Sequence, residues 1–206
     1  LAALPAELRE ADPWLLHWAG VAAIGRSADE ARDRLDRAFA RFEEAADASG
    51  VWLAWAARVD AAVAAWSDFG PLERALRDLE RLRQRFPCPG GEVERRVLLA
   101  AYLAATLAAA DHPDLPAWGE AVREMASAPH APGLRLVAGS QLALFESCLL
   151  GEIERSAALA GELRALAEGE GVPPVVAQRW RCFEAQVEFA AGRLDACAAA
   201  ATRAIE

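Results

Sequence analysis

The sequence predicts an all-α protein, a right-handed α-solenoid of about five antiparallel helix hairpins. Three observations lead to this prediction: apolar residues recur at helical spacing along the whole chain, glycine and proline separate these segments, and pairs of segments repeat every 40 residues or so. No stretch of useful length shows the alternation typical of a half-buried strand. We expect residues 1–206 to form a single solenoid. Because the last helix ends on small apolar residues without a polar cap, we also expect a fragment of a longer multidomain protein.

Apolar stripes define the individual helices. Leu72, Leu76, Leu79 and Leu82 recur every three or four residues, and the same spacing occurs within 31–45, 52–66, 153–166 and 176–187. The sequence predicts ten helices, at about 13–24, 28–48, 51–67, 71–86, 92–110, 115–128, 133–150, 152–168, 174–191 and from 193 onward.

Capping residues mark several of the boundaries. Asp12 precedes Pro13, which suits the first position of a helix, and Ser27 with Glu30 has the spacing of a capping box. We expect sharp turns at Gly50, Gly151 and Gly192, and helix starts after the prolines that follow other turns.

The predicted helices form pairs whose members differ in composition. The first members begin near 13, 51, 92, 133 and 174, and they are the more apolar. The second members, such as 29–45 and 72–86, carry charge on one face. Stacked hairpins predict this difference, because an inner helix contacts both neighbouring hairpins while an outer helix leaves one face in water.

Small and apolar residues of the first helix, the turn and the second helix of each pair follow a recurrent spacing. Examples are Gly192, Leu194, Cys197, Ala201 and Ala204; Gly151, Ile153, Ser156, Ala160 and Leu163; Gly20, Ala31, Leu35 and Ala38; Ala75, Leu79 and Leu82; and Ala121, Met125 and Ala128. On these residues the chain resembles tetratricopeptide (TPR) repeats, which implies close helix packing rather than chemistry. The segments "DPWLLHWAG" and "WSDFGPLERAL" are similar to the repeat or sensor region of large bacterial ATP-dependent regulators of the maltose-regulon-activator type. That resemblance implies a signalling or transcription-regulation arm whose nucleotide chemistry lies outside this segment.

Composition restricts the classes of partner. The net charge of −9 and pI near 5.0 argue against direct binding of nucleic acid, which needs a basic surface. The most apolar segment, 97–110, is shorter than the roughly 20 residues of a membrane span. The sequence does not begin with a signal peptide. The four cysteines show no metal-ligand or redox spacing, and we expect small buried thiols in a reducing cytoplasm.

No catalytic signature is recognisable. Without any lysine the chain has no Walker A motif, and it also lacks the nucleophile-elbow, zincin and calcium-loop patterns. His112 and His130 lie in predicted turns. The acidic clusters alternate with arginine, which is typical of solvated helix faces. We therefore expect no enzyme activity, no metal and no cofactor.

Polar residues on the apolar first helices are the candidate binding site. One line of groove-facing positions runs through His17, Asp60, Thr106, Gln141 and Cys182, with Trp14, Arg179 and Gln186 nearby. Each could instead satisfy a local hydrogen bond or face solvent. The functional hypothesis is that they line a concave surface for a protein or peptide, another domain of the same chain, or a small-molecule effector. The alternative is a receptor with a closed pocket near Trp14, His17 and Asp60.

Six of the seven tryptophans fall into two predicted classes. Trp18, Trp55, Trp66 and Trp180 lie on apolar stripes and are predicted in the core. Trp14 and Trp118 follow loops and are candidate exposed anchors of an interface.

Overall fold

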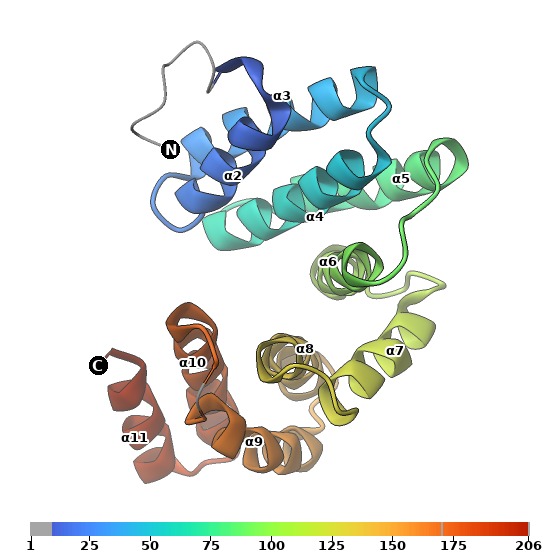
Figure 1. Ribbon diagram of the computed structural model, residues 1–206. Coiled ribbons are helices and arrows are strands. Elements are labelled where there is room, and N and C mark those ends of the chain that lie inside the picture. Colours follow the sequence, from blue (N-terminus) through green and yellow to red (C-terminus); the bar gives the residue numbers. More distant parts are fainter. Residues whose placement is uncertain (1–9, 170, 206) are drawn as a thin grey trace. The chain divides into compact units, whose positions relative to one another are not determined.

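The computed structural model describes residues 10–169 and 171–205, and over these residues it is all-α (Figure 1). The ten α-helices of this part of the chain confirm the predicted all-α class, and apart from the end of the helix predicted over 133–150 each begins and ends within a few residues of its predicted bounds. They are α2 (Pro13–Ala23), α3 (Ala28–Glu44), α4 (Ala48–Ala65), α5 (Gly70–Arg85), α6 (Glu92–Ala108), α7 (Leu115–Ser127), α8 (Pro132–Leu144), α9 (Ile153–Ala167), α10 (Pro174–Ala190) and α11 (Leu194–Ile205). None of these helices is long and apolar enough to cross a membrane.

The helices form two compact units, unit 1 over Leu1–Leu115 and unit 2 over Pro116–Glu206. In unit 1, α2 packs on α3, α4 packs on α2, α3 and α5, and α6 packs on α4 and α5. In unit 2, α8 packs on α9, and α10 packs on α8, α9 and α11. Apart from α7, sequence neighbours within each unit are therefore in contact, and so are the first helices of consecutive hairpins. This sequential packing is consistent with helical repeats.

The core of unit 1 is built around α4. Trp52 and Trp55 are at most 1% exposed, and their ring centroids lie 6.2 Å apart in an edge-to-face arrangement. The Trp55 indole Nε1 donates a 3.0 Å hydrogen bond to the Ala75 carbonyl oxygen, which ties α4 to α5. On α5 the leucines of the predicted stripe, such as Leu72 and Leu79, are buried, and each full burial contributes about 1.5–3 kcal/mol.

The core of unit 2 lies between α8, α9 and α10. Trp180 of α10 is fully buried there, as predicted, and so are Ser156, Ala160 and Leu163 of α9, three residues of the repeat spacing. The Ser156 hydroxyl donates a 3.0 Å hydrogen bond to the Ala143 carbonyl oxygen. The remaining buried members of this apolar cluster are Leu136, Ala143, Ala167 and Val187.

Small residues allow close helix approach in the first hairpin. A Cβ atom at Gly20 would lie 2.7 Å from Leu35 Cγ, so only glycine lets α2 approach α3 this closely. In the last hairpin the predicted spacing is confirmed only in part: Ala204 is buried, whereas Cys197 and Ala201 are half-buried and the neighbouring Ala200 is fully buried.

Two predicted caps form, one of them only in part. Asp12 Oδ1 accepts hydrogen bonds from the backbone N–H groups of Trp14 (2.8 Å) and Leu15 (3.0 Å). Ser27 Oγ accepts from Glu30 N at 3.4 Å, but the Glu30 carboxylate pairs with Arg34 at 2.8 Å. The capping box is therefore half complete.

The predicted turn at Gly50 is wrong. The chain turns at 45–47 instead, with Ala46 at φ 52°, and Asp47 caps α4 by accepting from Gly50 N at 2.9 Å. Gly50 is helical and buried. A side chain does not fit there, because a Cβ atom would come 2.2 Å from a carbon of the Phe42 ring. The predicted turns at Gly151 and Gly192 are confirmed by their positive φ angles of 70° and 72°.

The helix predicted over 133–150 changes type before it ends. Residues Phe145–Leu149 form a π-helical turn, labelled η1, closed by a 3.1 Å bond from Leu150 N to the Phe145 carbonyl. Glu146 of this turn is 1% exposed, and its Oε1 lies 2.8 Å from Arg123 of α7 and 3.2 Å from Arg155 of α9. The wider turn places this carboxylate against two arginines.

The prediction of buried thiols is wrong. Cys88, Cys148 and Cys182 are exposed and Cys197 is half-buried, all four as free thiols. Cys88 lies in the loop between α5 and α6, Cys148 lies in the turn η1, and Cys182 lies on the exposed side of α10, so none of these three positions faces the core.

Candidate interaction surfaces

Helix α10 carries one face that is exposed along its whole length. Val175, Arg179, Cys182 and Gln186 follow each other at intervals of four, three and four residues, which places them on one side of a helix. All four are exposed, and Phe189 extends the row with 67% of its surface exposed. We call these five residues the α10 face. Three of them are predicted site residues, and the structure brings these three together.

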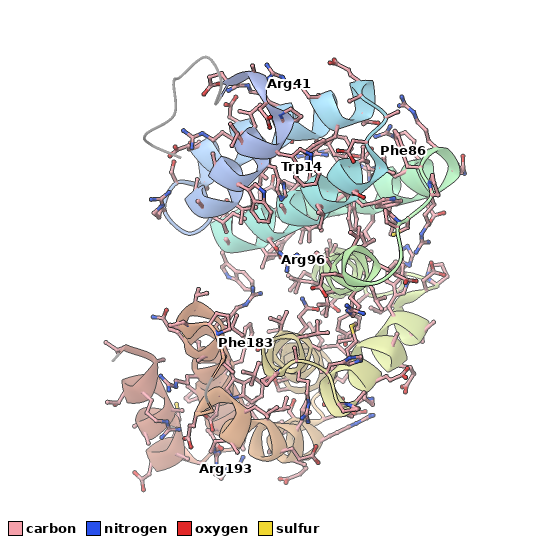
Figure 2. The ribbon with its side chains drawn as sticks, in the orientation of Figure 1. Trp14, Arg41, Phe86, Arg96, Phe183 and Arg193 are labelled. Atoms are coloured by element: carbon pink, nitrogen blue, oxygen red, sulfur yellow. The ribbon has the colours of Figure 1, made fainter. Side chains whose placement is uncertain are left out.

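The opposite side of α10 is fixed by buried charges. Glu184 and Glu188 are 2% and 5% exposed, and the Arg164 guanidinium of α9 forms ion pairs with both. Arg203 of α11 lies 3.3 Å from Glu184. Arg193, labelled in Figure 2, pairs with Glu188. Both carboxylates are therefore compensated, as buried charges must be.

The α10 face combines a cation with apolar side chains. The Arg179 guanidinium carbon lies 5.9 Å from the centroid of the Phe183 ring, a cation–π distance. Among the described residues no carboxylate forms an ion pair with Arg179, so its hydrogen-bond donors remain available. Val175 and Phe189 are 69% and 67% exposed toward the two ends of the row. Arginine and aromatic residues of this kind are enriched at protein interfaces.

His17 of α2 lies in the interior of unit 1 and not on a groove surface. It is 3% exposed, and its ring lies 4.9 Å from that of Trp18 and 6.4 Å from that of Phe42, between centroids. Burial lowers the pKa of His17 to about 4, with a further contribution from the positive charge of Arg96. The imidazole is therefore neutral at pH 7, and its Nδ1 has no hydrogen-bond partner among the described residues.

Asp60 is occupied by an ion pair that sequence reasoning missed. Its carboxylate binds Arg96, which extends from α6 (Figure 2) and so links α4 to α6. Because Arg96 also acts on His17, its charge influences residues of α2 and α4. The only sign of this ion pair in the sequence is the position of Arg96 near the start of an apolar helix, and its partner Asp60 is 36 residues away.

Two other predicted site residues are in the interior. Thr106 of α6 is 3% exposed and Gln141 of α8 is 4% exposed. Neither Thr106 Oγ1 nor Gln141 Oε1 has a hydrogen-bond partner among the described residues. Their side chains do not reach a surface, because these helices are buried on most sides. The predicted polar line is therefore exposed only on α10 and, in part, at Asp60.

The tryptophan predictions are partly wrong. Trp55 and Trp180 are buried as predicted, but Trp18 and Trp66 are 53% and 62% exposed. Trp66 follows the last residue of α4 with φ 45°, so its side chain leaves the stripe.

The two candidate anchors also differ from the prediction. Trp118 is buried, at 7% exposure. Trp14 is half-buried, with its ring centroid 4.8 Å from that of Phe42.

Comparison with known proteins gives no relative from which a function could be transferred. No family model, no curated protein and no solved structure matches the chain. Within the described residues, no group of three or more histidine, cysteine or acidic side chains is arranged to hold a metal ion.

Proposed function

We propose that this chain is a non-enzymatic protein-interaction segment that binds a protein or peptide partner through the α10 face. In this proposal the hairpins form a right-handed solenoid of the TPR type. The observation that supports it best is the exposure, on a single helix, of Arg179, Cys182 and Gln186 between Val175 and Phe189.

The partner should match the chemistry of this face. Arg179 calls for a carboxylate or a backbone carbonyl, and Gln186 can both donate and accept a hydrogen bond. Val175 and Phe189 call for apolar side chains on either side of that polar centre. We therefore expect a mixed surface, typical of a non-obligate interface.

The proposed role in the cell is that of a sensor arm in a bacterial regulator. In stacked hairpins each unit contacts only its neighbours, so a partner bound to one helix can change the curvature of the stack. A partner that prefers one curvature shifts the population toward it and so biases an attached switch.

Cys182 makes the proposal directly testable. Single-cysteine variants carrying only Cys182, only Cys148 or only Cys88 are labelled with benzophenone maleimide and irradiated in an extract of the producing cells. Cys148 is the matched control, because it is an exposed thiol of unit 2 that lies outside the α10 face.

We expect a covalent partner adduct from Cys182 that is absent from both controls. Arg179→Glu, introduced into the Cys182 variant, should abolish the adduct while the far-ultraviolet circular dichroism spectrum stays the same. Adducts of equal yield from Cys148 and Cys182, or an adduct that survives Arg179→Glu, would argue against binding at this face.

A further inference from the structure

Unit 1 contains a hollow of about 190 Å³ between α3, α4 and α5. Three arginines and two aspartates line it, together with five small apolar residues. We call it the arginine hollow; its lining residues are Ala28, Arg32, Asp36, Arg58, Ala61, Ala62, Pro71, Arg74, Ala75 and Asp78. No sequence pattern singled it out, because its walls come from three helices.

One of the three arginines is already compensated within the protein. Arg58 Nε lies 2.6 Å from an Asp36 carboxylate oxygen, and Arg58 Nη1 lies 3.9 Å from one of Asp78. The same guanidinium stacks over the Phe39 ring, 4.7 Å from its centroid. The charge of Arg58 is therefore already compensated by Asp36 and Asp78 within the lining.

The other two arginines, Arg32 and Arg74, are not compensated by a strong ion pair. Arg32 of α3 has a single ion-pair contact, at 3.5 Å, with Asp29, whose side chain is 95% exposed. Such an exposed pair contributes little. Among the described residues, no carboxylate forms an ion pair with Arg74 of α5. Two cations from two different helices thus lack a strong partner, in a protein whose net charge is −9.

Alanines line part of the arginine hollow and also border a second space. This second hollow, of about 220 Å³, shares Ala28 and Ala61 with the arginine hollow and is lined further by Ala64 and Ala65 of α4. The volume of the arginine hollow alone equals that of roughly six waters, which suits a group of a few heavy atoms.

We propose that the arginine hollow binds a carboxylate carried on a short aliphatic chain. Arg32 and Arg74 hold the carboxylate by charge-assisted hydrogen bonds, and the aliphatic chain covers the alanines of the lining. A monoanion is favoured over a phosphate dianion because Asp36 and Asp78 add negative charge to the same lining. The carboxylate can belong to a free acid or to a glutamate side chain of a peptide. This inference is independent of the α10 face, which lies in unit 2.

The experiment observes the arginines directly. The Nε–Hε resonances of Arg32 and Arg74 are assigned from the Arg32→Lys and Arg74→Lys variants in two-dimensional ¹H–¹⁵N spectra. The intact protein is then titrated with butanoate, with the blocked peptide acetyl-Ala-Glu-Ala-amide, with inorganic phosphate and with butylammonium. Inorganic phosphate tests the effect of an anion without an aliphatic chain. Butylammonium tests the effect of the aliphatic chain without an anion.

We expect saturable shifts of both resonances with butanoate or with the peptide, at a Kd in about the millimolar range. Whichever of the two binds more tightly identifies the source of the carboxylate. The double variant Arg32→Ala/Arg74→Ala should weaken binding at least about tenfold, measured on backbone resonances of α4. Ala62→Leu, which fills the hollow without changing its charge, should do the same.

The matched control is Arg77→Ala, an arginine of α5 whose side chain is 69% exposed and which does not line the hollow. It should leave the Kd unchanged. The proposal is overturned if neither carboxylate shifts Arg32 and Arg74, if phosphate or butylammonium binds as tightly as butanoate, or if Ala62→Leu has no effect.

Discussion

Buried His17 should make unit 1 sensitive to mild acid. The perturbation is a change from pH 7 to pH 5, compared between the wild type and His17→Leu. In the folded protein the pKa of His17 is lowered to about 4, mainly by burial and also by Arg96. The unfolded chain therefore binds a proton at His17 more readily than the folded one does. His17 therefore has little effect on the free energy of unfolding above about pH 6.5, and it lowers this free energy as the pH drops toward 4.

The magnitude follows from these two pKa values. With 6.5 in the unfolded state and about 4 in the folded state, linkage predicts a loss of about 1.8 kcal/mol between pH 7 and pH 5. This is a large fraction of the roughly 5–15 kcal/mol by which domains are stable. Because other ionisable groups also contribute to the pH dependence of stability, the informative quantity is the difference between wild type and variant.

Urea unfolding followed by tryptophan fluorescence measures this difference. The signal reports mainly on unit 1, because five of the seven tryptophans precede residue 115: Trp14, Trp18, Trp52, Trp55 and Trp66. His130→Leu, at an exposed position between α7 and α8, is the matched control and should behave like the wild type. Equal losses of stability in the wild type and in His17→Leu would refute the reasoning.

Three further predictions concern packing, buried charge and thiol reactivity. Gly50→Ala should lower the free energy of unfolding by about 1–3 kcal/mol, because its Cβ would overlap the buried ring of Phe42. Gly161→Ala should raise the free energy of unfolding by about 0.5–1 kcal/mol, because Gly161 is helical with open space around it. Urea titrations of the two variants measure both changes. Arg164→Ala should lower the free energy of unfolding by about 2 kcal/mol and Glu184→Gln should lower it less, because only Arg164→Ala leaves two buried carboxylates short of a partner. Equal losses of stability for the two variants in thermal unfolding would contradict this prediction. With Ellman's reagent at pH 7.5, Cys88 should react more slowly than free cysteine, because partial desolvation of its exposed thiol and the charge of Glu94 raise its pKa; a rate equal to that of free cysteine would contradict this prediction.

The helices could be predicted from the sequence because their signals are local. Asp12 caps α2 within three residues, and the leucines of α5 repeat within one helix. The same local logic found the α10 face, where Arg179, Cys182 and Gln186 interrupt an apolar helix at helical spacing.

What the sequence could not give depends on how helices meet. Gly50 looks like a turn residue until Phe42 is seen packed against it from the preceding helix. The pair between Asp60 and Arg96 joins two hairpins and requires their register. The arginine hollow has the same origin, since its walls belong to helices whose spacing no local pattern encodes.

The charges beneath α10 have a consequence for anything that docks on it. Glu184 and Glu188 receive arginines from both flanking helices, so α10 cannot rotate about its axis without breaking ion pairs on two sides. The row from Val175 to Phe189 is therefore presented on a rigid support. A partner loses little entropy in ordering such a platform, and a modest contact area can then suffice for specific association.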